Sequence, residues 1–158
     1  MTAEEERNAR IVAEQHAHLS AGRIPEAVAQ WADPISNHGR PVPRSVIEAI
    51  LTDILATFPD LDFPVEELTA SGPNVVARCR FRGTHKGVGK LPVNGGLLVD
   101  VAPTGKFMDV QHIHWYVLKD GLVTTHWANR DDVGMMQQLG LLAKPDFDYS
   151  KLGAPPPR

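Results

Sequence analysis

Residues 107–129 read FMDVQHIHWYVLKDGLVTTHWAN. Apolar side chains recur at alternate positions before and after Lys119-Asp120-Gly121, a short turn signal that contains glycine. This pattern predicts a β-hairpin with strands over residues 107–118 and 122–129.

The register of this hairpin determines which face His126 takes. Residues two apart on a strand share a face, so His112 and His114 are expected to point the same way. A three-residue loop with Gly121 in the left-handed conformation sets His114 opposite His126, and all three imidazoles then share one face. A strict two-residue turn sets His114 opposite Trp127 instead and sends His126 to the other face. We favour the first register.

The residues before the hairpin change from a helical period to a strand period. Apolar side chains at helical spacing predict a first helix that ends at residues 21–23, a second over 24–31 and a third over 45–58. Residues 75–82 alternate between apolar and polar side chains, which predicts a half-buried strand. The glycine-rich residues 86–105 are expected to form a long loop or a short hairpin.

A last helix is expected to begin after Asp131 or Asp132, because either carboxylate can cap it, and to end at Gly140. Helices first and antiparallel strands after them indicate an α+β fold rather than alternating βαβ units. The length of 158 residues fits one domain, predicted over residues 1–144. The proline-rich tail at 145–158 is expected to be partly disordered.

The composition argues against several classes of protein. The formal net charge of −3 is unfavourable for a protein that binds the phosphate backbone of nucleic acids. No apolar run approaches the ~20 residues of a membrane span, and the acidic first residues do not resemble a signal peptide. Cys79 is the single cysteine and cannot form an internal disulfide, which fits a reduced, cytoplasmic protein.

Three clustered imidazoles are suited to general acid–base catalysis, because each titrates near neutral pH and burial tunes its pKa. A zinc site is an alternative, since His112 and His114 with a third histidine supply three nitrogen ligands. A second shell of acidic side chains that would orient such ligands is not evident on these strands, so we expect no metal and no cofactor. A structural role is the other alternative, with core or interface histidines bonded to the backbone.

Short motifs between residues 7 and 142 resemble the ordered landmarks of the SnoaL-like polyketide cyclase family. They are Phe58-Pro59-Asp60, Gly83-Thr84-His85-x-Gly87, Pro103-Thr104-Gly105, His114 six residues before Asp120-Gly121, His126-Trp127 and Gln138-Leu139-Gly140. Their spacing is similar to that of the family except between Gly87 and Pro103, where this chain carries an insertion around residues 93–96.

The resemblance implies an NTF2-like cone, in which N-terminal helices and a curved antiparallel sheet enclose a deep apolar pocket, and it implies a homodimer. The family includes cofactor-independent cyclases that close a ring of an aromatic polyketide by intramolecular aldol condensation, with a pocket histidine and an aspartate. The histidine carries over to His114. The aspartate position, two residues after His126, is Ala128 here, and a methyl group can neither accept nor donate a proton.

Three functions remain open. In a cyclase-type reaction on a small hydrophobic aromatic substrate, Asp131, His112 or His126 replaces the missing carboxylate. The resemblance also extends to hydroxylases of antibiotic biosynthesis, which bind no metal or flavin and here would require a partner reductase. The third function is binding of an apolar ligand without catalysis. The residues expected to contact the substrate are Tyr116, Trp31, Asn37, Phe58 and Ala128.

Overall fold

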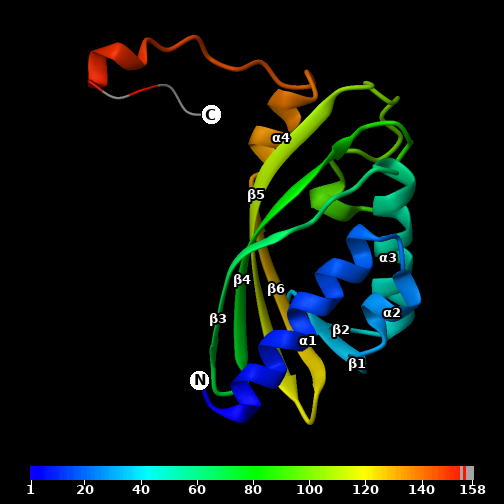
Figure 1. The fold of residues 1–158 in the computed structure, drawn as a ribbon. Coiled ribbons are helices and arrows are strands. Elements are labelled where there is room, and N and C mark those ends of the chain that lie inside the picture. The colour runs from blue at the N-terminus through cyan, green and yellow to red at the C-terminus, as the bar shows by residue number, and fades with distance from the viewer. Residues whose placement is uncertain (154, 156–158) are drawn as a thin grey trace.

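Six strands form one curved sheet in the order β2-β1-β6-β5-β4-β3 (Figure 1). Their bounds are β1 Trp31–Asn37, β2 Arg40–Val42, β3 Val65–Ser71, β4 Asn74–Thr84, β5 Phe107–Lys119 and β6 Leu122–Arg130. The computed structural model describes residues 1–153 and 155. Strand β1 runs parallel to β6, and every other neighbouring pair is antiparallel.

Helices cover one face of this sheet. Figure 1 shows α1 (Ala3–Ser20), α2 (Ile24–Val28) and α3 (Arg44–Thr57) on the same side of the long strands, and α4 (Asp132–Gln138) near the far end of β5. Alternate side chains of β4, which include Val75 and Ala77, are buried under the helices. This burial of apolar surface stabilises the two layers, and the α+β prediction is confirmed.

The predicted helix over residues 24–31 is wrong beyond Val28. Trp31 begins β1, and this strand pairs with β6 and with β2. Neither β1 nor β2 was predicted, and β3 was also missed. Proline at position 34 cannot donate a ladder hydrogen bond, and the strand forms because a partner far along the chain supplies the remaining bonds.

The hairpin turn contains two residues, not three. Asp120 and Gly121 have φ of 52° and 78°, and Lys119 pairs with Leu122. Positive φ at both central positions is the type I′ geometry that fits the twist of the flanking strands. The predicted three-residue loop is therefore wrong.

A β-bulge at Thr124 then restores the face of His126. The register shifts by one residue between the pairs Leu118–Val123 and Val117–Thr125. His114 consequently lies opposite Ala128, and His126 lies opposite Tyr116. Both pairings considered from the sequence are wrong, yet the expectation that His112, His114 and His126 share one face is confirmed by the hydrogen bonds between their rings.

The C-terminal elements are short. Asp131 caps α4 by accepting a hydrogen bond from the Gly134 amide at 2.8 Å, which confirms one of the two predicted caps. Residues 141–153 lead away from the sheet (Figure 1). The disorder predicted at 154 and 156–158 lies outside the described residues. Within the described chain, none of the helices combines the length and the apolar character needed to cross a membrane.

Candidate active site

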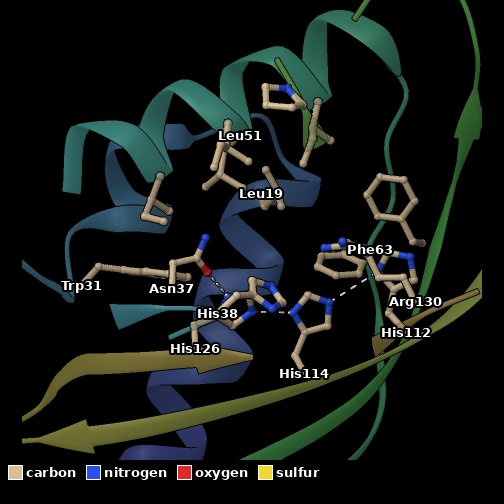
Figure 2. A pocket seen from close by; sticks show the side chains of 15 residues that line it. Leu19, Trp31, Asn37, His38, Leu51, Phe63, His112, His114, His126 and Arg130 are labelled. Atoms are coloured by element: carbon tan, nitrogen blue, oxygen red, sulfur yellow. Dashed lines mark hydrogen bonds between the residues drawn. The ribbon is translucent and has the colours of Figure 1, made fainter. Parts of the chain in front are cut away.

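A cavity of about 230 Å³ lies between α3 and the concave face of the sheet (Figure 2). Apolar side chains of α3 form one wall, and a row of histidines on β5 and β6 forms the opposite wall. The lining residues are Leu19, Trp31, Asn37, His38, Ile47, Ile50, Leu51, Ile54, Phe63, Phe81, Pro92, His112, His114, His126 and Arg130.

Hydrogen bonds connect the rings into a row along the sheet. Asn37 Oδ1 lies 2.9 Å from His126 Nδ1, and His126 Nε2 lies 2.8 Å from His114 Nδ1. His114 Nε2 lies 3.4 Å from His112 Nδ1. The row therefore begins at the amide of Asn37 and ends at His112 Nε2, which makes no hydrogen bond within the described residues.

The orientation of the amide at one end sets the tautomer of every ring in the row. With Asn37 Oδ1 as the acceptor, His126 Nδ1–H donates to it, and Nδ1–H of His114 donates to His126 Nε2. His112 then donates through its own Nδ1–H, and its Nε2 carries a lone pair. If the Asn37 amide is turned over and donates instead, all donors reverse and His112 Nε2 carries the hydrogen. In either direction, every hydrogen bond of the row has one donor and one acceptor while all three rings stay neutral.

Burial keeps these imidazoles neutral. Desolvation, with smaller contributions from nearby positive charge, lowers the pKa of His112 to about 3 and that of His126 to about 3. Desolvation and the neighbouring His126 lower the pKa of His114 well below its usual value of 6.5. At neutral pH the row is uncharged and can donate or accept hydrogen bonds without ion pairing.

A further buried histidine, His16, lies next to the row. His16 on α1 is buried, with Nδ1–H donating to the Phe63 carbonyl at 3.2 Å and Nε2 accepting from the Tyr116 hydroxyl at 2.9 Å. A smaller cavity of about 70 Å³ lies between these groups and the rings of His114 and His126. The two cavities share lining residues, among them His114 and His126.

Arg130 carries the only formal charge on the pocket wall at neutral pH among the residues that the structure describes. It lies opposite His112 on the neighbouring strand. Its Nε is buried without a hydrogen-bond partner, and the nearest carboxylate oxygen, Oδ2 of Asp132, is 3.7 Å away. No aspartate or glutamate is found among the described lining residues.

Most of the residues predicted for the site lie at or near this cavity. Trp31, Asn37 and the histidines of β5 and β6 line it, with Trp31 placed by β1 and not by a helix. Tyr116 is buried and lines the smaller cavity. Ala128 faces His114 across the strands but is absent from the lining.

Two of the predicted residues lie away from the cavity. Phe58 is 2% exposed and packs in the core against Phe81 and His85. Asp131 is exposed at the start of α4 and does not reach the histidines. The structure therefore brings no carboxylate from Asp131 into the row.

Sequence reasoning missed His16, His38, Phe63 and Arg130. Arg130 lies beyond the predicted end of its strand, although its spacing of two and four residues from Ala128 and His126 placed it on the same face. His38 has a φ of 50° in the turn between β1 and β2, strands that were not predicted. His16 lay next to the apolar face of the predicted first helix, and that position was its only signal.

The alternative of a zinc site finds no support in the arrangement of ligands. The ring nitrogens of the row face one another at hydrogen-bonding distances. In the described part of the chain, no group of three or more histidine, cysteine, aspartate or glutamate side chains is arranged to hold a metal ion.

Comparisons with known proteins agree with this architecture. A family model described as SnoaL-like polyketide cyclase matches residues 10–139. No protein in the curated set matches. AclR, a proposed hydroxylase from Streptomyces galilaeus, superposes with a TM-score of 0.73 at 21% identity over 94% of this chain and 89% of its own.

Two further solved structures are described as cyclases. IdmH, a proposed polyketide cyclase from Streptomyces antibioticus, has a TM-score of 0.68 and 24% identity, covering 84% of this chain and 98% of its own. A SnoaL-like polyketide cyclase from Agrobacterium tumefaciens has a TM-score of 0.69 and 23% identity, covering 84% and 98%. At these low identities, the similarity to the solved structures shows a shared fold and nothing finer.

Proposed function

The chain belongs to the SnoaL-like polyketide cyclase family, and from this premise we propose that it is an enzyme that moves protons next to a carbonyl group of an aromatic, polyketide-like molecule. The observation that carries the proposal is the row of three hydrogen-bonded neutral imidazoles along one wall of an apolar pocket. A protein that only binds an apolar ligand requires one or two orienting groups, and a hydrogen-bonded row exceeds that need.

The reaction that fits this row is an intramolecular aldol cyclisation. His112 Nε2 accepts a proton from a carbon that lies between two carbonyl groups, and the resulting enolate carbon attacks a ketone carbon of the same molecule. The ketone oxygen becomes an alkoxide and takes the proton back. Atoms and charges balance without a co-reactant, because the substrate and the cyclised product are isomers.

A lowered pKa makes His112 a weak base in the empty pocket. The enolate that forms beside it supplies an opposite charge, and an opposite charge favours the protonated ring. The positive guanidinium of Arg130 also stabilises the enolate, and such stabilisation is strong where water is excluded. Proton transfer thus produces a pair of charges that the pocket holds together.

Hydroxylation is the second candidate, and the absence of a carboxylate opposite His114 favours it. Ala128 occupies the position across from His114, so no acid stands ready to protonate an alkoxide from that side. A hydroxylase would use molecular oxygen and an external reductant, and a partner reductase would supply the electrons. The same deprotonation at His112 would begin either reaction.

The size of the cavity limits the substrate. An apolar protein cavity of about 150 Å³ holds benzene, and the cavity described above measures about 230 Å³. Two fused aromatic rings fill such a space. A larger polycyclic substrate would place two rings beside the histidines and its remaining rings in the mouth of the pocket.

We also propose that the protein forms a homodimer through the outer face of its sheet. Trp115, Trp127 and Ile113 lie on that face with 51%, 48% and 43% of their surface exposed. Exposed apolar patches of this kind mark association surfaces. Sedimentation of the wild type and of Trp115→Lys would test this, with a monomeric wild type contradicting it.

The proposed activity is tested with a bicyclic aromatic substrate that carries an active methylene group and a ketone within reach of each other. Purified protein is incubated with it in the presence and absence of oxygen, and the products are analysed by mass spectrometry. We expect an isomer of the substrate to form in both cases, with a rate in His114→Ala lower by at least about a hundredfold, the usual contribution of acid–base catalysis.

His18→Ala is the matched control, because His18 lies on α1 outside the pocket lining. A product that gains one oxygen atom and requires oxygen would replace the cyclase proposal with the hydroxylase. Changed ligand affinity in His114→Ala, with no turnover of any aromatic polyketide, would show that the protein is a binding module.

A further inference from the structure

We propose that the pocket selects aromatic ligands that carry an oxyanion, and that Arg130 holds this group next to His112. The inference rests on the proposed function, because it names the substrate class of the same site. The ligand would be a bicyclic aromatic molecule with a carboxylate, or with an acidic hydroxyl that binds as its anion.

The charge of the pocket wall is opposite in sign to that of the chain. The chain has 19 acidic and 16 basic side chains, with a formal net charge of −3. The titratable groups on the pocket wall are four histidines and Arg130, and no described lining residue is acidic. Since burial lowers the pKa of these histidines, the wall carries one positive charge at neutral pH.

Unlike the three arginines of β4, Arg130 makes no side-chain hydrogen bond within the described residues. Arg80 donates to Asp109 at 2.8 Å and Arg82 donates to Asp62 at 2.6 Å, both on the outer face. The side chain of Arg130 donates to no described residue, and its Nε is buried without a partner. A buried donor without an acceptor is costly, so hydrogen bonds to the protein do not hold this guanidinium. Because Nε is itself inaccessible, an oxyanion in the cavity would bind the outer nitrogens of Arg130, which lines the cavity.

Asp132 compensates the charge of Arg130 only in part. Its Oδ2 lies 3.7 Å from Arg130 Nε, beyond hydrogen-bonding distance, and its Oδ1 is itself buried without a partner. Asp132 is on α4 and does not line the cavity. A planar guanidinium can donate to two acceptors in different directions, so a ligand can bind on the pocket side of Arg130.

His112 lies beside Arg130 at this end of the row. Figure 2 shows His112 and Arg130 at the end of the row opposite Asn37, and the two residues pair across β5 and β6. An oxyanion held by the charged guanidinium of Arg130 receives a charge-assisted hydrogen bond. The ligand then lies next to His112 Nε2, the nitrogen that acts as the base in the proposed reaction.

Binding of 2-naphthoate and of its uncharged analogue 2-naphthamide, measured by isothermal titration calorimetry, tests this inference. We expect the wild type to bind 2-naphthoate at least about tenfold more tightly than 2-naphthamide, because charge-assisted hydrogen bonds are stronger than neutral ones. Arg130→Met should bind the two probes with similar affinity, and Arg130→Lys should keep part of the preference.

The matched control is Arg82→Met, which removes the same charge from the outer face of the sheet and should leave the preference unchanged. Arg130→Gln replaces Arg130→Met if the latter fails to give a native circular dichroism spectrum. Equal affinities in the wild type, or a preference that survives in Arg130→Met, would overturn the inference while leaving the proposed enzyme intact. Failure of both probes to bind the wild type would count against the pocket itself and so against both proposals.

Discussion

Asn37 determines the electrostatic state of three rings through one side chain. Among the described residues its amide forms a hydrogen bond with His126 alone, yet the tautomers of His114 and His112 follow from that contact. An amide has no charge, so it orients the row without stabilising an imidazolium. A carboxylate at the same place would orient the row in one direction and also attract a proton to it.

Asn37→Asp should therefore raise the pKa of His126 from its lowered value of about 3 by at least about one unit, because an adjacent opposite charge favours the protonated ring. Ring resonances of His126, followed by NMR during a pH titration, measure this change. Asn129→Asp is the control, because Asn129 is exposed on the opposite face of β6. An unchanged pKa in Asn37→Asp, or the same shift in both variants, would contradict the role assigned to Asn37.

The bulge in β6 determines which side chains of that strand face the pocket. A two-residue turn alone would send His126 to the outer face, and the additional residue Thr124 returns it to the pocket. The Thr124 hydroxyl donates to the Val117 carbonyl at 3.1 Å and fixes the bulge. Bulges often re-aim side chains next to active sites.

Deletion of Thr124 should turn His126 away from His114 and break the row. We expect the turnover of the bicyclic substrate to fall by at least about a hundredfold, comparable to the loss of an acid–base group, and a crystal structure to place His126 on the outer face. Thr124→Val keeps the residue count and removes only the hydroxyl, so most of the activity should remain. Full activity in the deletion variant would exclude a role for His126 in the row.

Strands β1, β5 and β6 show how much of the fold could be predicted from the sequence alone. The hairpin of β5 and β6 was predictable because Lys119-Asp120-Gly121 and the alternating side chains are local signals. The bulge was not, since its position depends on packing beneath the helices. Strand β1 was missed, and its first residue Trp31 was assigned to a helix, because its parallel partner β6 lies far away in the sequence and long-range pairing overrides local pattern.

The residues of the candidate site were likewise predictable where the signal was local, and not where they depend on long-range strand pairing. His112, His114 and His126 could be grouped from strand periodicity. Arg130 could not be assigned to the pocket before the end of β6 and the register opposite His112 were known. His38 depends on the turn between two strands that were missed.

At the scale of the molecule, buried histidines with lowered pKa values make stability depend on pH. The pKa of His112 and of His126 is lowered to about 3, that of His16 to about 4, and that of His114 well below 6.5, each mainly by burial. Below the ordinary pKa near 6.5 the unfolded chain takes up protons that the folded protein does not. The free energy of unfolding is therefore level above that pH and falls as the pH decreases toward 4.

Each such ring is expected to contribute about 1.4 kcal/mol per pH unit once the pH is well below 6.5. Urea unfolding at a series of pH values between 7 and 4.5 measures the total slope. His112→Phe, whose ring can keep the stacking on Phe81, should reduce the slope by about the contribution of one proton. The control His18→Gln should not change it, and a flat profile in the wild type would mean that these rings are protonated in the folded state.

The hydrogen bond between Asn37 and His126 joins residues 89 positions apart. During synthesis β1 leaves the ribosome early and lacks its neighbour β6 until nearly the whole domain has emerged, since domains fold as units when their contacts are complete. A ribosome-bound chain that stops before residue 126 thus contains Asn37, His112 and His114 but lacks His126, the ring that connects the amide to the other two. Ligand capture by nascent chains of increasing length would begin abruptly when β6 clears the exit tunnel.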